Sequence, residues 1–416
     1  MDFDFPQRVI EIERRAMAMA DSRFGEIDRI AETNTKKVLN AFHSHRVSDT
    51  YFAGTTGYGY NDRGREQLDS ICADIFGAES GLFRINLISG THAITSALFG
   101  ALSPGQELLY VTGTPYDTLL GVIGVTGNYH GSLRQYGISY REVPVTEDGL
   151  PNFKLIKEAA AHKDVGVVAI QRSRGYSSRK SLSISEIGEI CTCVRAVNPG
   201  AVIFVDNCYG EFVETLEPCD VGADLVAGSL IKNPGGGLAP TGGYVAGRAD
   251  LVENASMRMT VPGLGGEAGA TLGNNRLLYQ GLFMAPHTVS QAMKTVIFCA
   301  ACMEILNYKS FPAWDDKRTD IIQMIEFGTP QNLIKFCRGI QRGGPVDSFV
   351  TPEPSSMPGY DSQIIMAVGG FIQGASIELS ADGPIREPYA AYLQGGLTFE
   401  SGKLGILAAI DEILSE

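Results

Sequence analysis

The feature that most constrains the fold of this chain is a series of short, continuous apolar runs separated by helical segments. The runs are rich in valine and isoleucine and lie at Glu107–Val111, Val165–Ile170, Ala201–Val205 and Asp224–Ser229. A strand buried on both faces reads as an unbroken apolar run, because neither face meets water. The pattern therefore predicts an α/β fold, with a mainly parallel sheet covered by helices on both faces.

Sequence on either side of this series predicts the rest of the chain. Residues 8–42 interleave charged and apolar side chains, as a long surface helix does, and a polar, glycine-rich stretch follows at 51–60. The other expected elements are helices at 64–76, 289–306 and 404–414, and strands at 84–88, 363–368, 375–379 and 392–399. We expect three parts: an N-terminal helical segment (1–55), a large domain (56–288) and a smaller α+β C-terminal domain (289–416).

Composition excludes several classes of protein. The chain has 34 basic and 47 acidic residues, a net charge of −13, whereas a protein that binds nucleic acid through its backbone phosphates has the opposite balance. Polar residues interrupt the one long charge-free stretch, at 85–106, and no secretory pattern opens the chain. The eight cysteines lack metal-site or disulfide spacing. We expect a soluble cytoplasmic protein with free thiols, no metal, and neither a membrane nor a nucleic-acid partner.

An aspartate and a lysine lie at the predicted ends of neighbouring strands. Asp206 directly follows the run Ala201–Val205, and Lys232 follows the run that ends at Ser229. Open α/β sheets bind ligands at the carboxyl ends of their strands. Pyridoxal phosphate needs a lysine amine for its aldehyde and a carboxylate for its pyridine nitrogen. The pair suits this cofactor, although taken singly Lys232 also fits a solvated loop and Asp206 a turn or helix cap.

Two further segments are expected at the same edge of the sheet. Ser89, Gly90 and Thr91 open an apolar helix, and amides exposed at the start of a helix bind anions such as phosphate. Tyr116 follows the run Glu107–Val111, where its ring can lie against a flat ligand. Many α/β proteins have such a loop without a phosphate, and a tyrosine can simply pack beneath a loop. The agreement among the segments is what indicates a phosphate, a ring and an aldehyde.

The order of these residues resembles fold-type-I pyridoxal-phosphate enzymes of the cystathionine and methionine lyase group. Longer blocks are similar to the bacterial methionine gamma-lyase family, whose members are often described as aluminium-resistance proteins or cystathionine beta-lyases. The blocks are GYGYNDRGR (57–65), TPYDTL (114–119), GSLIKNPGGGLAPTGGY (228–244), MPGYDS (357–362) and YLQGGLTFE (392–400). The resemblance covers about residues 20–410. It implies the aspartate-aminotransferase-like fold, with a mainly parallel central sheet and a smaller C-terminal domain.

The resemblance also implies roles for the residues already singled out. Lys232 would bind the cofactor aldehyde and then move protons at the substrate Cα. Asp206 would pair with the pyridine nitrogen, and Tyr116 would stack on the ring. The phosphate would be held by the remaining residues of the two turns, Ser89, Gly90, Thr91 and Ser229.

Related lyases complete the phosphate site with a tyrosine and an arginine from a neighbouring subunit. Counting back from Gly90 gives Tyr60 as the tyrosine, with Tyr58 second, and implies a dimer or a tetramer of dimers with shared sites. The family arginine falls on Asp62, which departs from the pattern. Arg63 or Arg65 are the nearby replacements.

A second departure concerns the substrate carboxylate. Members of the group bind it with an arginine near the last strand before the C-terminal helix, and the expected strand 392–399 contains none. Arg386, Arg172 and Arg174 are the candidates, because a guanidinium suits a carboxylate, although each also fits an ordinary ion pair.

The function that follows is a carbon–sulfur lyase that depends on pyridoxal phosphate. The resemblance implies β- or γ-elimination on a sulfur amino acid such as cystathionine, cysteine or methionine, giving a thiol, ammonia and a 2-oxo acid. Sequence leaves open which elimination occurs. It also leaves open another pyridoxal-phosphate reaction (transamination, aldol cleavage or racemisation) and a protein that binds the cofactor without turnover.

Overall fold

The computed structural model describes residues 3–127, 129–175, 177, 179–356 and 362–415. The chain divides into two compact units, a large unit of residues 36–283 and a second unit that joins residues 1–35 to residues 284–416. Residues 1–55, expected as a segment of their own, are thus shared between the units. The large unit ends at residue 283, whereas the sequence predicted a boundary after residue 288.

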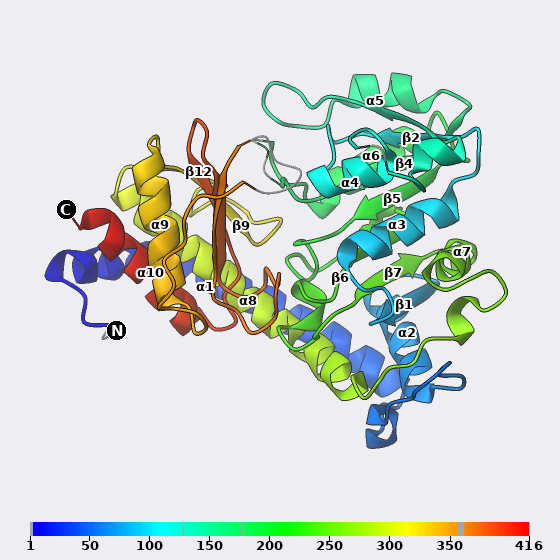
Figure 1. The fold of residues 1–416 in the computed structure, drawn as a ribbon, viewed down its shortest axis with the longest axis horizontal. Helices are drawn as coiled ribbons and strands as arrows, with labels where there is room; N and C mark the ends of the chain where they lie inside the picture. Colours follow the sequence, from blue (N-terminus) through cyan, green and yellow to red (C-terminus); the bar gives the residue numbers. More distant parts are fainter. Residues whose placement is uncertain (1–2, 128, 176, 178, 357–361, 416) are drawn as a thin grey trace. The chain divides into compact units, whose positions relative to one another are not determined.

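Helices and strands alternate through the large unit, as Figure 1 labels them. Its elements are α2 (Arg63–Ile75), β1 (Ser80–Arg84), α3 (Gly90–Ala101), β2 (Glu107–Tyr110), α4 (Asp117–Ile123), β3 (Ser139–Glu142), α5 (Phe153–Ala160), β4 (Val165–Gln171), α6 (Ile184–Arg195), β5 (Val202–Asp206), β6 (Leu225–Ser229), β7 (Gly243–Gly247) and α7 (Ala249–Met259). Two long helices, α1 (Gln7–Ser44) and α8 (Asn275–Ile305), have residues in both units. The second unit adds β8 (Lys309–Phe311), β9 (Ile322–Glu326), α9 (Pro330–Gly343), β10 (Ile364–Val368), β11 (Ser380–Pro384), β12 (Ala390–Gln394) and α10 (Phe399–Leu414).

A seven-stranded sheet forms the centre of the large unit, in the order β1-β7-β6-β5-β4-β2-β3. Strand β7 is antiparallel to both of its neighbours, and the pairs from β6 to β3 are parallel. Every residue of β4, β5 and β6 is buried. The four apolar runs therefore became strands within one or two residues of their expected bounds, and the predicted α/β fold with a mainly parallel sheet is confirmed.

Helix α3 carries the apolar residues that cover one side of this sheet. Ala93, Ile94, Ala97 and Leu98 recur at helical spacing and pack into a core with strand residues such as Phe204. Contacts of α3 with β6 and β7 follow from this stripe. The start of α3 is thereby held against the carboxyl end of β6.

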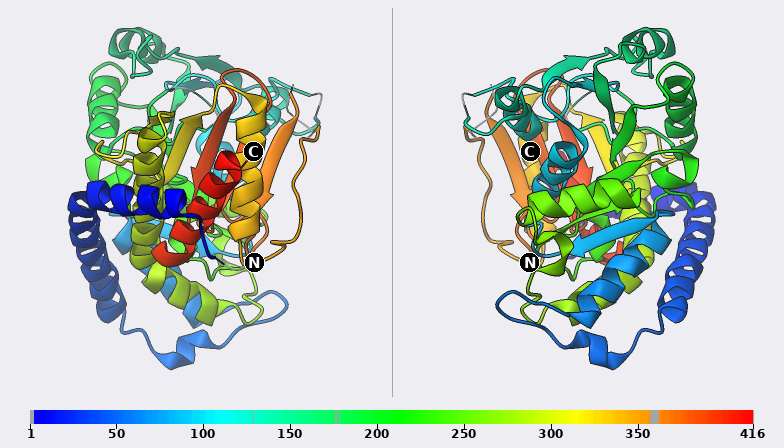
Figure 2. Two further views of the ribbon diagram at one scale, coloured as in Figure 1. Left: turned by 90° about the vertical axis from the view of Figure 1, so that its left-hand side faces the viewer. Right: turned by 90° about the vertical axis from the view of Figure 1, so that its right-hand side faces the viewer.

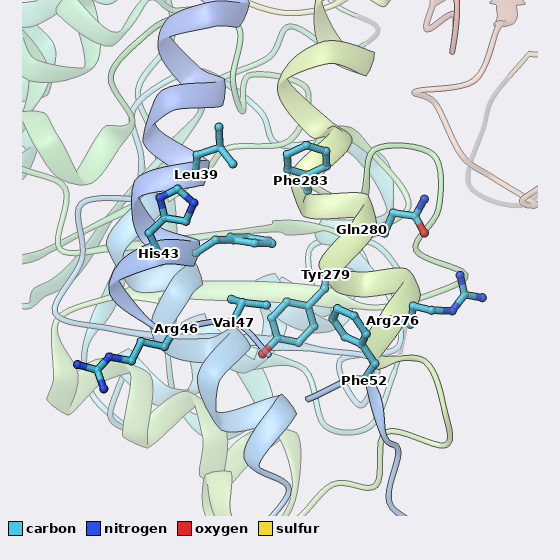
Figure 3. A pocket seen from close by; sticks show the side chains of 10 residues that line it. Leu39, His43, Arg46, Val47, Phe52, Arg276, Tyr279, Gln280 and Phe283 are labelled. Atoms are coloured by element: carbon cyan, nitrogen blue, oxygen red, sulfur yellow. The ribbon is translucent and has the colours of Figure 1, made fainter. Parts of the chain in front are cut away.

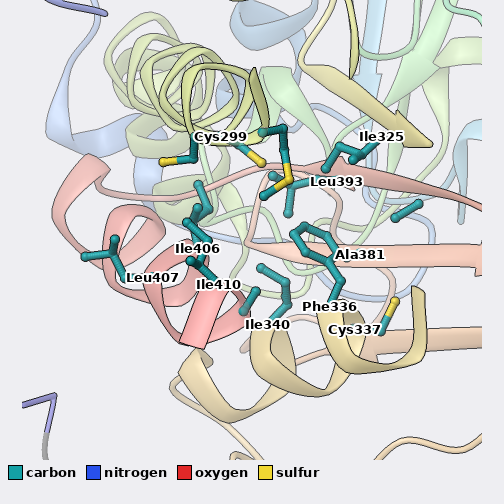
Figure 4. Packing of buried hydrophobic residues seen from close by; sticks show 14 of the residues in the cluster. Cys299, Ile325, Phe336, Cys337, Ile340, Ala381, Leu393, Ile406, Leu407 and Ile410 are labelled. Atoms are coloured by element: carbon teal, nitrogen blue, oxygen red, sulfur yellow. The ribbon is translucent and has the colours of Figure 1, made fainter. Parts of the chain in front are cut away.

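The second unit has a separate, antiparallel sheet in the order β10-β11-β12-β9-β8. Helices α9 and α10 lie side by side, as the turned view of Figure 2 shows. Their inner faces bury residues such as Phe336 and Ile406 together with Cys299 of α8 and Leu393 of β12 (Figure 4). The α+β character expected of the C-terminal region is thus confirmed, and its core also includes Val9 and Ile12 of α1.

Two expected strands are wrong. Of the run 84–88 only Arg84 lies in a strand, as the last residue of β1, and residues 85–88 form a turn in which Ile85 and Leu87 are buried. The run 375–379 is irregular, since the buried Glu378 carboxylate accepts from the amides of Phe371 and Ile372, and the strand begins after it. In both places burial, rather than strand pairing, produced the apolar pattern.

The helix expected at 289–306 begins earlier, at Asn275, and continues through Pro286. A proline normally ends a helix, so the sequence concealed the first turns of α8. The expected strand 392–399 occupies Ala390–Gln394. The block at 357–362, which contributed to the family resemblance, lies outside the described residues except for Ser362.

Within the described ranges, no helix is long and apolar enough to cross a membrane. All eight cysteines are free, and the described residues include no cluster of three side chains able to hold a metal ion.

Candidate active site

The structure brings Lys232 and Asp206 together at the carboxyl edge of the large sheet. Asp206 is the last residue of β5 and is buried, and Lys232 lies in the turn that follows β6. Burial raises the pKa of the Asp206 carboxyl, and the positive charge of Lys232 opposes this rise. Burial lowers the pKa of the Lys232 amine, but the negative charges that Cys208, Tyr209 and Asp206 can carry outweigh it and raise the pKa overall. The pair is therefore electrostatically coupled.

Two neighbours of this pair were not expected from the sequence. The amine of Lys232 lies 3.9 Å from the centroid of the Tyr209 ring, a cation–π contact. Tyr209 has a positive φ of 72°, an uncommon conformation that directs its ring. The amide of Cys208 donates to Oδ1 of Asp206 at 3.1 Å and orients that carboxylate. Both residues lie within three positions of Asp206, which is the one signal that could have indicated them.

The start of helix α3 approaches the end of β6 closely. Ser89 caps the helix, since its hydroxyl accepts from the amide of His92 at 3.1 Å. A side chain at Gly90 would place its Cβ 2.9 Å from the Cβ of Ser229, so this position requires glycine. The absence of a side chain lets the first turn of α3, with the amides of Gly90 and Thr91, lie close to Ser229. This is the arrangement that binds a phosphate group.

Tyr116 connects this helix start to the coupled pair. Its hydroxyl donates to Oγ1 of Thr91 at 3.2 Å, and its amide donates to Oε1 of Gln171 at 3.1 Å. Burial raises the pKa of the Tyr116 phenol, and the charge of Asp206 raises it further while that of Lys232 lowers it. The phenol is therefore neutral at physiological pH and lies near both charged groups.

These residues fit pyridoxal phosphate. A buried carboxyl whose burial disfavours its charge is suited to a ring N–H cation, and Lys232 supplies an amine on the same edge. The space kept by Gly90 beside Ser229 suits the phosphate. The site that the sequence predicted from four separate segments is thus one place in the fold.

The tyrosine pair lies in the segment that precedes α2. Tyr58 and Tyr60 are 65% and 49% exposed and stack on each other, with ring centroids 5.3 Å apart and an interplanar angle of 5°. Arg65 anchors this segment, because its buried guanidinium donates to the carbonyls of Gly59 at 2.7 Å and Gly269 at 2.8 Å. Arg65 is thus a structural residue. Two exposed aromatic rings are therefore presented on an anchored loop.

Asp62, which occupies the place of the family arginine, has a structural role of its own. It is buried at the N-cap of α2, and four groups donate to its carboxylate: Thr55 Oγ1 at 2.5 Å, Thr271 Oγ1 at 2.7 Å, the Arg65 amide at 2.9 Å and Asn275 Nδ2 at 3.2 Å. Burial raises the pKa of this carboxyl, but the hydrogen bonds outweigh it, so the pKa is lowered overall. An arginine could not replace these acceptors.

We predict that Asp62→Ala lowers the free energy of unfolding by about 2–4 kcal/mol, since it removes a helix cap and leaves buried donors unpaired. Denaturant titration measures this change, with exposed Asp148→Ala as the control. The pH dependence follows from the lowered pKa: the contribution is full above the ordinary value of 3.8 and is lost as the pH falls through the folded-state pKa. If the difference in free energy of unfolding between wild type and Asp62→Ala stayed the same in strong acid, the capping role of the Asp62 carboxylate would be contradicted.

The three candidate substrate arginines have different surroundings. Arg172 is fully buried, and its guanidinium donates to Asn207 Oδ1 at 2.8 Å, the Gly210 carbonyl at 2.9 Å and Glu214 Oε2 at 3.0 Å. This bonding is that of a structural arginine, whose donors are occupied within the protein.

Arg174 is buried just beyond the end of β4, at the same edge of the sheet as Asp206. Arg386 is exposed in the turn between β11 and β12 of the second unit. Arg179, which the sequence did not single out, is buried, donates to the carbonyl of Gln171 at 2.7 Å, and lowers the pKa of Asp206 through its charge.

The large unit also has an apolar cavity of about 640 Å³, shown in Figure 3. It is lined by Leu39, Phe42, His43, Arg46, Val47, Phe52, Arg276, Tyr279, Gln280 and Phe283. None of the candidate site residues lines it, so it is distinct from the site around Lys232.

Comparison with known proteins gives matches along most of the chain. The family model for methionine gamma-lyase matches residues 9–414. The uncharacterized protein YnbB of Bacillus subtilis is 54% identical over 94% of this chain and 93% of its own. A carbon–sulfur lyase involved in aluminium resistance from Clostridium novyi has a solved structure with a TM-score of 0.95 and 51% identity, covering 99% of this chain and 97% of its own. L-methionine gamma-lyase of Pseudomonas putida is 27% identical over 53% of this chain and 50% of its own.

Proposed function

Because this chain belongs to the methionine gamma-lyase family, we propose that it is a pyridoxal-phosphate-dependent carbon–sulfur lyase. The observation that carries the proposal is the coupling of Lys232 with Asp206 at the sheet edge, beside the glycine-bearing start of α3. The fold and the comparisons support the class of reaction. The individual roles of these residues are our assignment.

When bound, the cofactor draws electrons from the substrate Cα, so that a proton there becomes acidic. Asp206 would hold the ring nitrogen protonated, and the ring of Tyr116 would lie against the ring of the cofactor. The amides of Gly90 and Thr91, with the hydroxyl of Ser229, would hold the phosphate. Ser89 would keep these amides in position by capping the start of α3.

The Lys232 amine would remove the proton from the substrate Cα. The electron pair of the breaking carbon–sulfur bond would leave with the sulfur, which takes up a proton and departs as a thiol. Water would then release the remaining fragment as a 2-oxo acid and ammonia. Of the candidate arginines, Arg174 or Arg386 would bind the substrate carboxylate.

The direct test is product analysis with the purified full chain. Incubation with cystathionine, cysteine or methionine should give, from each amino acid that is a substrate, ammonia, a 2-oxo acid and the sulfur product in equal amounts; the sulfur product is a thiol, or hydrogen sulfide in the case of cysteine. Pyruvate from cystathionine identifies β-elimination, whereas 2-oxobutyrate identifies γ-elimination. Formation of an amino acid of opposite chirality, or of a 2-oxo acid without thiol, would replace the lyase by another pyridoxal-phosphate reaction.

We further propose that the enzyme is a cytoplasmic dimer, or a tetramer of dimers, in which Tyr60 serves the site of a neighbouring subunit. The exposure of the stacked pair Tyr58 and Tyr60 supports this proposal. Tyr60 would contact the phosphate and the substrate from the partner, with Tyr58 as the alternative.

Subunit complementation measures this sharing. Tyr60→Ala and Lys232→Ala should each be inactive alone, but mixed and reassembled dimers should recover about one quarter of the wild-type activity. Half of the dimers are then mixed, and each has one intact site out of two. The same mixture without dissociation and reassembly is the control. An active monomer in sedimentation, or no recovery in reassembled dimers, would contradict the shared site.

A further inference from the structure

A set of buried polar side chains lies beside Lys232, and the proposed reaction does not use it. Glu211 is fully buried, and the hydroxyl of Tyr244 donates to its Oε1 at 2.9 Å. Asn207 donates to the Tyr244 hydroxyl at 3.3 Å and to Oε2 of Glu217 at 3.0 Å. A continuous set of hydrogen bonds thus connects two buried carboxyl groups.

This set is attached to both residues of the coupled pair. Asn207 directly follows Asp206, and Asn233 directly follows Lys232. The side chain of Asn233 donates to the backbone carbonyl of Glu211 at 3.0 Å. Glu211 is therefore tied by its backbone to the turn that carries the lysine, and by its side chain to the strand end that carries the aspartate.

The strand next to the lysine turn is shaped around the Glu211 carboxyl. A Cβ at Gly228 would lie 2.6 Å from Oε1 of Glu211 and 2.5 Å from the ring of Tyr244. Glycine at this position leaves the space that the carboxyl occupies. The group has a defined place in the fold.

The surroundings of Glu211 do not suit a negative charge. Its Oε2 has no hydrogen-bond partner among the described residues, and none of their ion pairs includes this carboxyl. Burial raises the pKa of Glu211 to about 8, and the charge of Glu217 contributes to the rise. A hydrogen bond from the backbone of Glu211 opposes this rise most, followed by the Tyr244 hydroxyl and the charge of Lys232.

The other charges nearby do not change this balance. The charge of Glu211 acts on the thiol of Cys208, whose pKa burial raises well above its ordinary value, so this neighbour is neutral. Glu217 accepts from the amide of Phe212 at 2.9 Å, and Arg172 lies 3.9 Å from its Oε2. Arg172 and Lys37 act on Glu217 and lower its pKa, against its burial. The cations Arg172 and Lys37 therefore offset the charge of Glu217.

We propose that Glu211 is a positioning residue for the reactive lysine, tied to the Lys232 turn through Asn233 and holding a buried carboxyl in the space left by Gly228. The inference rests on the proposed role of Lys232. While Glu211 is neutral, it keeps the lysine turn in place without adding negative charge. Once it ionises, the new charge favours the ammonium form of Lys232 and reduces the fraction of amine able to attack an aldehyde.

The charge state is tested by infrared spectroscopy of the full chain between about pH 6 and about pH 10. Wild type should show the carbonyl stretch of a buried carboxylic acid, lost with a midpoint near 8. The band should be absent from Glu211→Gln and present in Glu189→Gln, which alters an exposed carboxyl. A wild-type protein without this band at neutral pH would overturn the inference.

The effect on Lys232 is tested by incubating the full chain with pyridoxal phosphate, reducing with borohydride and mapping the labelled peptide. At about pH 7 the labelling rates of wild type and Glu211→Gln should agree within about twofold, because an amide resembles the neutral acid. At about pH 9 the wild type should be slower by about threefold or more. Equal rates at both pH values, or a faster variant at about pH 7, would overturn the role.

Tyr244→Phe provides a second variant should Glu211→Gln fail to fold. It removes the donor that favours the carboxylate, so the infrared midpoint should move to higher pH. An unchanged or lowered midpoint would contradict the inference. Failure of the proposed function would give a different result. The infrared band of the acid would be present, but no label would appear on Lys232 in any variant. Lys232 would then not hold the cofactor, and the positioning role of Glu211 would be excluded as well.

Discussion

Replacing Lys232 by alanine is expected to abolish lyase activity and covalent attachment of the cofactor while the fold is retained. Lys232 lies in a turn after β6 and is not part of the apolar core, so its removal leaves the core of the sheet unchanged. Activity should fall by at least about a thousandfold, since the proposed nucleophile and base are the same group. Visible absorption before and after borohydride, followed by peptide mapping, measures the attachment.

Lys157→Ala is the matched control, because Lys157 is an exposed lysine on α5. It should keep both the yellow colour and the activity. Circular dichroism should be the same for both variants and the wild type. A Lys232→Ala protein that remains yellow through a borohydride-sensitive bond would show that another lysine holds the cofactor.

Asp206→Asn is expected to produce the second-largest loss. An amide lacks the negative charge that keeps a pyridine nitrogen protonated, so the cofactor would draw electrons from the substrate less effectively. We expect kcat/KM to fall on the order of a hundredfold or more, the scale at which a single preorganised electrostatic group contributes. Steady-state kinetics with the best substrate measures the loss.

The control for Asp206→Asn is structural as well as kinetic. Asparagine keeps an oxygen that can accept from the amide of Cys208, so the end of β5 should stay ordered. The variant should therefore still bind the cofactor and form the bond to Lys232. Full activity in Asp206→Asn would show that this carboxyl does not face the pyridine nitrogen.

The parts of the fold that could be predicted are those whose burial is uniform. Strands β4, β5 and β6 are buried at every residue, so their continuous apolar runs predict strands directly. The segment 375–379 alternates apolar and polar residues as a strand does, but a buried carboxylate, Glu378, organises it instead of strand pairing. Sequence patterns report burial and do not report which group satisfies the backbone.

The candidate site divides in the same way. Lys232 and Asp206 follow strands that the sequence predicts, and parallel strands end at the same edge of a sheet. We therefore expected both residues at the carboxyl edge of the large sheet. Tyr209 could not be expected, since its ring reaches Lys232 only because the backbone adopts a positive φ there. Arg172 shows the opposite case: the sequence suggested a ligand, and only three-dimensional contacts reveal that Asn207, Gly210 and Glu214 already occupy its guanidinium.

The anchoring of the tyrosine loop by Arg65 has a consequence for how subunits would meet. A loop that orders only on association loses its conformational entropy at that moment, which weakens binding and slows it. Here the carbonyls of Gly59 and Gly269 are already held by a buried guanidinium within one chain. The ordering entropy of this loop is therefore lost during folding, and assembly can proceed between rigid, preformed surfaces.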